Sequence, residues 1–408
     1  MIVLRAFKTE LDPTFRQTQE LLQHAGCARF AYNWGLRKKI DAYKATGKSP
    51  TAIDLHRELN ALKKVPVEDG GFPWMYCSSK CAPQEALRNL DSAFKSFFRR
   101  CKSGAKRKGF PRFKARHRGV GSFRLTGTIR ASESGVQLPS LGELRLKEHG
   151  YLPVDNVKVL SATISESAGR WFVSLQVEQE IVDTAPKSVN IVGVDVGIRH
   201  LAVTSDGAVF DNPLALVKAQ RTLRVRQKSV SRKVKGSANR RKAVARVAEV
   251  HRRVANIRKD AIHKMTTAIT KQASIIVVED LNVSGLLKNR CLARALSDAS
   301  LSEIHRQLAY KSKWNGVEFI KADRFYPSSK LCSGCGVKKD SMPLSERMYC
   351  CEACGLEIDR DLNAAINLKM WPTVASASAC CPGSSGRTLR SPTKLLVGQE
   401  RAGEVQDV

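Results

Sequence analysis

Four cysteines arranged as two C-x-x-C pairs constrain the fold of this chain more than any other feature. They are Cys332, Cys335, Cys351 and Cys354. Fifteen residues separate the pairs, which is within the range of zinc ribbons, and a glycine follows each pair (Gly336 and Gly355). Four thiolates can close a tetrahedron around one Zn²⁺ and leave no open position, so the pattern predicts a structural zinc. Cys350 could replace Cys351 as a ligand, and two unrelated redox pairs are the alternative interpretation.

The net charge indicates a polyanionic partner. The chain has 408 residues and a formal charge of +31, and nucleic acid is the partner that best offsets such a charge. Ribosome-like or membrane-surface binding is the alternative. No apolar run approaches the roughly 18 residues of a membrane span, and Arg5 and Lys8 interrupt the start before a signal sequence could form. We therefore expect a cytoplasmic protein with no membrane contact.

Three carboxylates stand at the edges of predicted elements. Asp195 lies in the continuous apolar strand IVGVDVG, and Glu279 ends a second buried strand, ASIIVVED. Asp361 lies in DRDLNAA, which begins a helix after the cysteines, and there Asp359 could cap the helix. Two or three convergent carboxylates can hold paired divalent metals, so these stretches predict a metal-dependent nuclease. An actin-like ATPase also begins with a D-x-G strand, but the later glycine-rich phosphate loops are missing from this sequence.

Two basic segments are suited to nucleic acid. In residues 101–119, lysines and arginines can neutralise phosphates while phenylalanine rings stack on bases, with a solvated loop as the alternative. The predicted contacts there are Lys106, Arg107, Lys108, Phe110, Arg112 and Phe113. Residues 214–272 predict two helices interrupted near Gly236. The predicted buried stripe consists of Val244, Val247, Val250, Val254, Ile257, Met265 and Ile269. Acidic partners are nearly absent from this pair, which favours phosphate binding. The predicted contacts on the pair are Arg240, Arg241, Lys242, Arg252 and Arg253.

The apolar pattern divides the chain into parts. Residues 13–121 have helical spacing, whereas 122–186 alternate with a period of two and predict the short antiparallel strands of a small β-barrel that the strand at 1–12 completes. Pro186 and Lys187 mark a linker. The helical part is then an insertion in the barrel.

The third part combines a strand, a hairpin turning at Asp206-Gly207 and a long helix, which is the opening of a ribonuclease-H-like fold. We assign it to residues 187–324 and 358–371, with the zinc ribbon inserted at 325–357. Residues 372–408 are rich in serine, alanine and glycine, and we expect them to be disordered. The predicted fold class is therefore α+β and multidomain.

Taken together, these motifs resemble the TnpB (OrfB) family of bacterial insertion sequences, miniature relatives of type V CRISPR effectors. The resemblance extends over nearly the whole chain. It rests on G-x-D-x-G, the strand ending in Glu-Asp, the two knuckles and D-R-D-x-N-A-A, together with GCARFAYNWGL, KGFPRFK, SRKVKGSANRRKA and YPSSKLCSGCG. It implies a RuvC-like nuclease domain with an inserted zinc ribbon, and a wedge barrel that carries a helical recognition domain.

The resemblance also implies an RNA-guided DNA endonuclease that cuts double-stranded DNA next to a short transposon-adjacent motif. By position, Asp195, Glu279 and Asp361 would be catalytic and would hold two Mg²⁺. Lys80 and Gln84 would lie near the adjacent-motif duplex. The expected partners are a guide RNA from the transposon end and the target DNA, in a monomeric ribonucleoprotein whose single site cuts both strands. A guide-dependent repressor or a transposition accessory factor without cleavage is the alternative.

Overall fold

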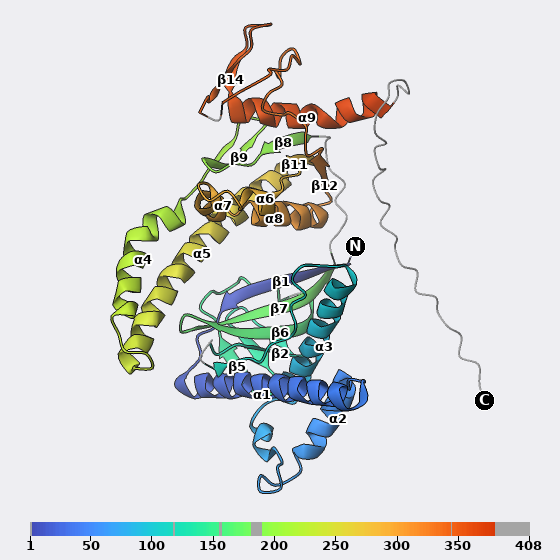
Figure 1. Cartoon of the computed structure of the whole chain (residues 1–408), viewed down its shortest axis with the longest axis vertical. Helices are drawn as coiled ribbons and strands as arrows, with labels where there is room; N and C mark the ends of the chain where they lie inside the picture. Colours follow the sequence, from blue (N-terminus) through green and yellow to red (C-terminus); the bar gives the residue numbers. More distant parts are fainter. Residues whose placement is uncertain (1, 117–118, 155–156, 181–189, 344, 380–408) are drawn as a thin grey trace, which may run out of the picture.

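The computed structural model describes residues 2–116, 119–154, 157–180, 190–343 and 345–379 (Figure 1). One half of the molecule is built on β-sheets and the helices α1 to α3, and the other half on a second sheet that lies between α9 and the helices α5 to α8. The predicted linker at Pro186 and Lys187 falls outside the described residues. No helix of the described residues is long and apolar enough to cross a membrane.

The N-terminal strand joins the strands that precede the linker. β1 pairs with β7 along its whole length, and the sheet order is β1-β7-β6-β2. A second sheet, β3-β4-β5, meets the first through a bridge between Leu11 and Leu146. The strands are β1 (Ile2–Glu10), β2 (Ser122–Leu125), β3 (Arg130–Ala131), β4 (Gly135–Leu138), β5 (Gly142–Arg145), β6 (Val157–Ser167) and β7 (Arg170–Glu180). The prediction that the first strand joins the later ones is confirmed, but the described strands form two bridged sheets and no continuous barrel ladder.

Three helices and one short 3₁₀ turn fill the sequence between β1 and β2. They are α1 (Phe15–Thr46), α2 (Ala52–Leu62), η1 (Pro73–Cys77) and α3 (Cys81–Lys102). Thr14 and Gln17 form a capping box that begins α1, and Gly47 ends it in the left-handed conformation. The apolar residues of α3, which recur every three or four positions, form a stripe that is buried at Leu87 and Leu90, where α3 packs against α1. It becomes exposed at Phe98.

The second half is a five-stranded sheet covered on both faces. Its order is β10-β9-β8-β11-β12, with β8 parallel to β11 and β11 parallel to β12, while β9 and β10 form the predicted hairpin. The strands are β8 (Ile191–Asp195), β9 (His200–Thr204), β10 (Val209–Asp211), β11 (Ile275–Glu279) and β12 (Glu318–Ala322). The helices are α4 (Ala215–Ser231), α5 (Ala238–Gln272), α6 (Val283–Leu286), α7 (Ala293–Ala299), α8 (Leu301–Trp314) and α9 (Arg360–Ala379).

Alternation along β8 explains the two covered faces. Val192 and Val194 pack with Ile262 of α5 and Leu308 of α8 in one core, and the residues between them face α9. At Gly193 this approach is so close that an added Cβ would lie 2.0 Å from the carbonyl oxygen of Ala365. The glycine therefore lets the α9 backbone lie directly on the strand.

The helices α4 and α5 extend away from the sheet as an antiparallel pair, as Figure 1 shows. The predicted interruption is confirmed, because Gly236 lies between the helices with φ +88°. The predicted stripe is buried at Val254, Met265 and Ile269, whereas the side chains of Val244 and Ile257 are 47% and 39% exposed. The projecting part of α5 packs against α4, whereas Met265 belongs to the core that contains Val192 and Val194 of β8.

A small two-stranded sheet, β13 (Met348–Cys350) with β14 (Glu357–Asp359), lies between β12 and α9 in the sequence and belongs to the segment that contains the four cysteines.

The predicted disordered tail begins too early, because α9 continues through Pro372 to Ala379. The apolar residues Leu368 and Trp371 pack near Val277 in a small core under α9. The rest of the predicted tail, 380–408, lies outside the described residues.

Candidate metal centres and nucleic-acid surfaces

The four predicted cysteines come together. Their sulfur atoms all lie within 4.8 Å of one another, with 3.6 Å between Cys332 and Cys354 and 3.6 Å between Cys335 and Cys351. Four sulfurs about 2.3 Å from one zinc ion would be about 3.8 Å apart in a tetrahedron. The cluster therefore fits a zinc ribbon.

The two knuckles have the same backbone geometry. In the first, the amide of Gly336 donates to the carbonyl of Cys332 at 2.9 Å; in the second, Gly355 donates to Cys351 at 2.9 Å. Both glycines adopt a positive φ, +76° and +73°, that other residues rarely take. Cys350 belongs to β13, is exposed, and is not among the four clustered cysteines, so Cys351 is the ligand that the geometry selects.

The three predicted carboxylates lie at one edge of the five-stranded sheet. Asp195 and Glu279 end the neighbouring parallel strands β8 and β11, whose register pairs Val194 with Val278 and so places the two carboxylates side by side. Both face α9, because Gly193 two residues before Asp195 contacts α9 and Val277 two residues before Glu279 belongs to the core under it.

Asp361, on α9, lies near the same edge of the sheet as Asp195 and Glu279. It lies one helical turn before Ala365, the residue that touches Gly193, and one turn is about 6 Å long. The two strand residues from Gly193 to Asp195 span about 6.6 Å. The helix N-terminus and the strand ends therefore converge.

Electrostatics reflect this convergence. Burial, followed by the negative charges of Glu279 and Asp361, raises the pKa of Asp195 well above the usual range, while Arg360 opposes the shift. Within the described part of the chain, the four cysteines form a compact group of potential metal ligands, and the three carboxylates are not gathered into such a group. An all-oxygen donor set with excess negative charge suits Mg²⁺.

The neighbouring carboxylates have other roles. Asp359 accepts the backbone N–H groups of Asp361 at 2.9 Å and Leu362 at 3.1 Å, so it caps α9 as the sequence allowed. Asp280 pairs with Arg324 at 2.5 Å and with Lys321 at 3.3 Å, and these contacts lower its pKa. Asp361 and Glu279 are thus the members of each adjacent pair that remain for a metal.

Ser328 is a site residue that the sequence analysis missed. Its hydroxyl donates to Glu279 Oε1, and its side chain is buried. Its carbonyl accepts a 2.7 Å hydrogen bond from Nδ2 of Asn367 on α9. The same helix presents Asn363, which donates to the Leu331 carbonyl at 2.6 Å. The helix α9 therefore connects the first knuckle to the carboxylate site through hydrogen bonds. In the sequence, the stretch YPSSK before the first cysteine was the available signal for Ser328.

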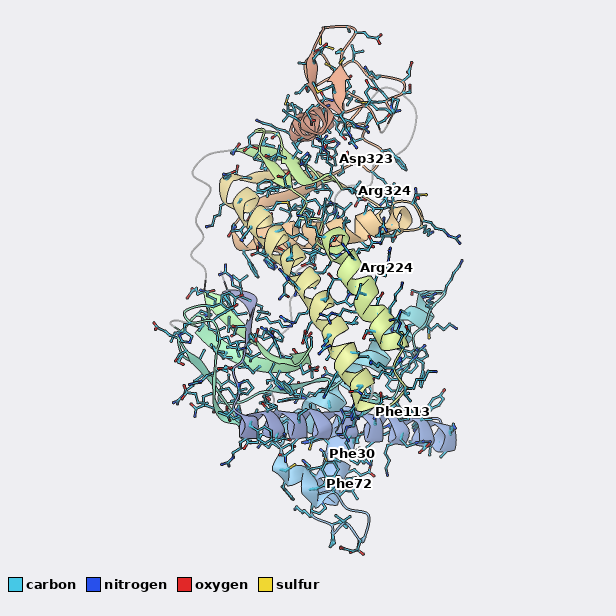
Figure 2. The ribbon with its side chains drawn as sticks, turned by 90° about the vertical axis from the view of Figure 1, so that its left-hand side faces the viewer. Phe30, Phe72, Phe113, Arg224, Asp323 and Arg324 are labelled. Carbon is cyan, nitrogen blue, oxygen red and sulfur yellow. The ribbon has the colours of Figure 1, made fainter. Side chains whose placement is uncertain are left out.

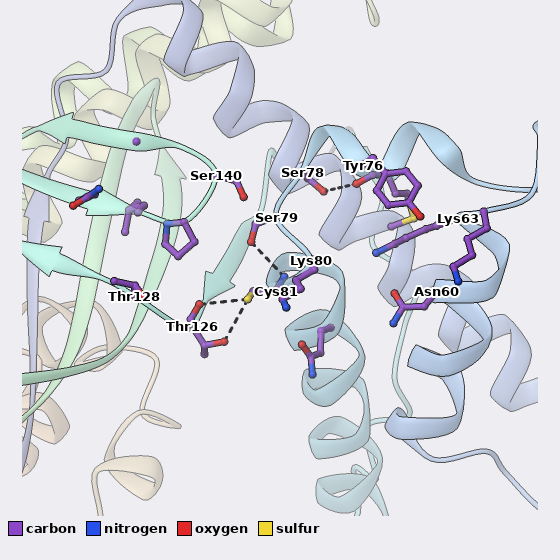
Figure 3. Close-up of a pocket in the computed structure, with 18 residues that line it drawn as sticks. Asn60, Lys63, Tyr76, Ser78, Ser79, Lys80, Cys81, Thr126, Thr128 and Ser140 are labelled. Atoms are coloured by element: carbon purple, nitrogen blue, oxygen red, sulfur yellow. Dashed lines mark hydrogen bonds between the residues drawn. The ribbon is translucent and has the colours of Figure 1, made fainter.

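Lys80 and Gln84 line a cavity of about 1230 Å³ between the N-terminus of α3, the end of α2 and the β4–β5 turn (Figure 3). Lys80 is exposed, and Lys63 and Lys64 add positive charge to the same wall. Figure 3 also shows Cys81 bonded to Thr126, with its sulfur 3.3 Å from the Thr126 carbonyl oxygen. This contact fixes the start of α3 against the strand side. The sequence analysis missed the residues of α2 and of the β-turn because they have no motif.

The predicted segment around the Gly-Phe-Pro turn is an exposed loop held at two points. The Asn33 side chain of α1 accepts from the Lys114 amide at 2.8 Å and donates to the Lys114 carbonyl at 2.9 Å. Arg100 donates to the Gly109 carbonyl at 3.4 Å. The cations predicted as contacts, Lys106, Arg107, Lys108 and Arg112, are all exposed. Phe113, seen beside α1 in Figure 2, is half exposed and lies under the guanidinium of Arg37.

The basic residues predicted on α5 fall into two groups. Arg241, Lys242 and Arg253 are exposed, which leaves them free to meet phosphates, and Arg252 is half-buried. Arg240 instead donates to the carbonyls of Val230 at 2.9 Å and Lys233 at 3.3 Å and so closes the turn between α4 and α5. Its main contact in the structure is therefore the turn of its own hairpin.

Three protein families match separate parts of the chain. A family described as "Probable transposase", OrfB of the IS605 type, matches residues 173–290, and the "Cas12f1-like, TNB domain" matches residues 302–368. The first contains Asp195 and Glu279, and the second contains the cysteines and Asp361. A "Helix-turn-helix domain" of the same OrfB type matches residues 1–48, where the structure has one strand and the single long helix α1.

Several relatives match nearly the whole chain. A protein of Streptomyces pristinaespiralis named "Putative RNA-guided DNA endonuclease" is 38% identical over 98% of both chains. The Escherichia coli protein named "Putative RNA-guided DNA endonuclease InsQ" is 32% identical over 96% of this chain and 98% of its own. Among solved structures, the "mini-RNA-guided endonuclease CRISPR-Cas_phi3" aligns with 90% of this chain and 92% of its own at 7% identity and a TM-score of 0.52, which shows a shared fold.

Proposed function

Because the chain belongs to the TnpB/OrfB family of insertion-sequence proteins, which is related to Cas12f, we propose that it is an RNA-guided DNA endonuclease of a transposable element. It would cut double-stranded DNA beside a short adjacent motif, at a single ribonuclease-H-like site. The full-length relatives and the net charge of +31 support nucleic-acid partners.

The observation that carries the proposal is the arrangement of Asp195, Glu279 and Asp361 on one face of the sheet, on two parallel strands and the helix that covers them. The strand order β10-β9-β8-β11-β12, with a hairpin on one side and parallel strands on the other, supports the ribonuclease-H-like assignment. The raised pKa of Asp195 supports a cationic ligand, because three carboxylates near one another favour a bound cation.

We assign the carboxylates to hold two Mg²⁺, with Asp195 between Glu279 and Asp361. When bound, such a pair supplies an activated water and stabilises the leaving 3′-oxygen of a phosphodiester. Glu279 is oriented by the buried hydroxyl of Ser328, and Asp361 by the helix that Asp359 caps. These contacts keep the carboxylates in position before metal binds, which lowers the cost of assembling the site.

We assign the duplex beside the target to the cavity that Lys80 and Gln84 line, and the guide RNA to the exposed basic faces of α5 and the loop that contains Arg107. In such systems the protein reads a short duplex motif, and base pairing with the guide supplies the target sequence. The cavity has both cations for phosphates and side-chain amides for base edges, the two kinds of contact that a short motif requires.

The test is cleavage of a plasmid library. The chain is co-expressed with RNA from the flanking transposon end and incubated with Mg²⁺ and a guide-matched target beside a randomised motif. We expect guide-dependent cutting that Asp195→Ala abolishes and that Asp280→Ala retains, because Asp280 is paired with Arg324. Target binding without cutting in the wild type would instead indicate the repressor, and cutting by Asp195→Ala would reject the assigned site.

A further inference from the structure

A second cavity, of about 560 Å³, lies between the C-terminal parts of α1 and α3 and the Gly-Phe-Pro turn. Its walls are mainly aromatic and aliphatic: Ile40, Tyr43, Phe94, Phe97, Phe98 and Phe110. Nothing in the assigned nuclease site or the motif cavity uses it. α1 lies at the end of the molecule opposite α9, so the cavity is remote from the proposed catalytic carboxylates (Figure 1).

Four of these aromatic rings, those of Phe94, Phe97, Phe98 and Phe110, form one connected cluster. Phe110 packs edge-on against Phe94, with ring centroids 5.6 Å apart, and against Phe97 at 5.3 Å. Phe98 stacks on Phe94 at 6.2 Å and contacts Phe97 at 5.2 Å. Tyr43 and Phe98 are nevertheless 63% and 54% exposed. The cluster thus presents ring faces to solvent although its members are close enough to bury one another.

The charges around the cavity favour a polyanion. Asp91 is the single carboxylate in the wall, and it is already paired with the buried Lys39 at 2.7 Å. Lys44 and Lys95 are exposed in the same wall and form no ion pair within the part of the chain that the structure describes. No Asp or Glu occurs between Asp91 and Glu133 in the sequence. A second copy of this chain would bring further positive charge, and protein interfaces are depleted of lysine.

Aromatic rings beside lysine side chains are suited to bind single-stranded nucleic acid, because every base can stack on a ring and every phosphate can pair with a lysine. We propose that this cavity holds an unpaired base of the guide RNA, stacked on Phe98 and Tyr43, with its flanking phosphates on Lys44 and Lys95. The inference rests on the proposed function for the identity of the RNA. It adds a binding site on the recognition helices for unpaired guide nucleotides, and the remote position makes the RNA a better occupant than the DNA strand being cut.

The test uses the full chain carrying Asp195→Ala, so that the result does not depend on nuclease activity. A ten-nucleotide oligouridylate is crosslinked by ultraviolet light at 0.4 M KCl, where screening weakens nonspecific phosphate contacts. We expect crosslinks on the peptides that contain Tyr43 and Phe98, and an affinity about 10-fold lower in Phe98→Ala. Phe98→Tyr should restore the affinity, whereas Phe15→Ala, which removes an 82% exposed ring at the start of α1, should not change it.

Salt dependence separates the two kinds of contact. Phe98→Ala should lower affinity without changing the slope of log affinity against log salt, whereas Lys95→Ala should reduce that slope by about one. Crosslinks elsewhere with no effect of Phe98→Ala would overturn the proposal, as would equal losses for single-stranded and duplex RNA. Phe98-dependent dimerisation in light scattering would assign the cavity to a second copy. DNA cleavage and its loss in Asp195→Ala test the proposed function, whereas RNA crosslinking and affinity test this cavity. Either proposal can therefore fail without the other.

Discussion

Replacing Gly193 with alanine should reduce both the rate of cleavage and the stability of the fold. The new Cβ would lie 2.0 Å from the Ala365 carbonyl oxygen and 2.5 Å from the Lys369 nitrogen, both in the α9 backbone. A real Cβ essentially never comes closer than 3.0 Å, so α9 must withdraw by at least about 1 Å (3.0 − 2.0). Overpacking of this kind typically costs about 1–3 kcal/mol.

The same displacement moves Asp361, which lies one turn before Ala365 on α9. A misplacement of about 1 Å in a reacting constellation can lower a rate by about 100-fold. Single-turnover cleavage of a guide-matched linear DNA measures that rate, and thermal unfolding by circular dichroism measures the stability. Both are recorded at a temperature where the variant is folded.

The matched control is Gly26→Ala in α1. Its Cβ would meet no atom within 4 Å, so we expect unchanged cleavage and a gain of up to about 1 kcal/mol in helix stability. The reasoning would be refuted by Gly193→Ala retaining the wild-type cleavage rate. A folded variant with normal cleavage and a lower melting temperature would mean that α9 does not set the position of Asp361.

Two further predictions concern stability. Cys335→Ser should lose the bound zinc, which atomic absorption measures, and should make residues 325–357 exchange their amide hydrogens faster, because structural zinc supplies the folding energy of such small units. The control, Cys350→Ser, should keep one zinc per chain. Loss of zinc in that control would contradict the assignment of Cys351 as the ligand. Burial lowers the pKa of Lys311 to about 8, so the unfolded state binds more protons between pH 8 and 10.5 and the free energy of unfolding should rise across that window by roughly 2 kcal/mol. Lys311→Met should remove the rise in urea titrations, and an unchanged pH dependence would show that Lys311 is not the group responsible.

The parts of the fold that follow from periodic patterns could be predicted. β8 and β11 are continuous apolar runs that end in a carboxylate, and Gly236 interrupts a basic helical pattern, so their types and boundaries agree with the structure. The zinc ribbon followed from ligand spacing alone. The place of Asp361 opposite Asp195 could not be worked out from pattern, because it depends on where α9 crosses the strand, and only the backbone contact at Gly193 reveals that.

Other features depend on tertiary context that a linear pattern does not contain. Val244 has the same spacing as buried residues of α5 but remains 47% exposed, whereas its neighbour Ala243 is buried, because α4 covers only one side of the projecting part of α5. The YPSSK stretch marks the place of Ser328 in the sequence, but nothing in it indicates the contact with Glu279, which arises only when the first knuckle docks on α9. Phe94, Phe97 and Phe98 have the same helical spacing as the buried Leu87 and Leu90, yet they line an open cavity. The Gly-Phe-Pro turn covers them with a single ring, that of Phe110.

Because α9 follows the sheet strands and the zinc ribbon in the sequence, translation delays the assembly of the proposed nuclease site. Translation has already produced β8 and β11 when Asp361 is still 82 residues (361 − 279) beyond Glu279. At about 5–20 residues per second, that interval lasts roughly 4–16 s. During it, the nascent sheet has its Gly193 face uncovered and lacks the third carboxylate. On the proposed function, a chain that stalls or is cut in the zinc ribbon would fold much of the proposed nucleic-acid-binding surface but lack a carboxylate of the proposed nuclease site.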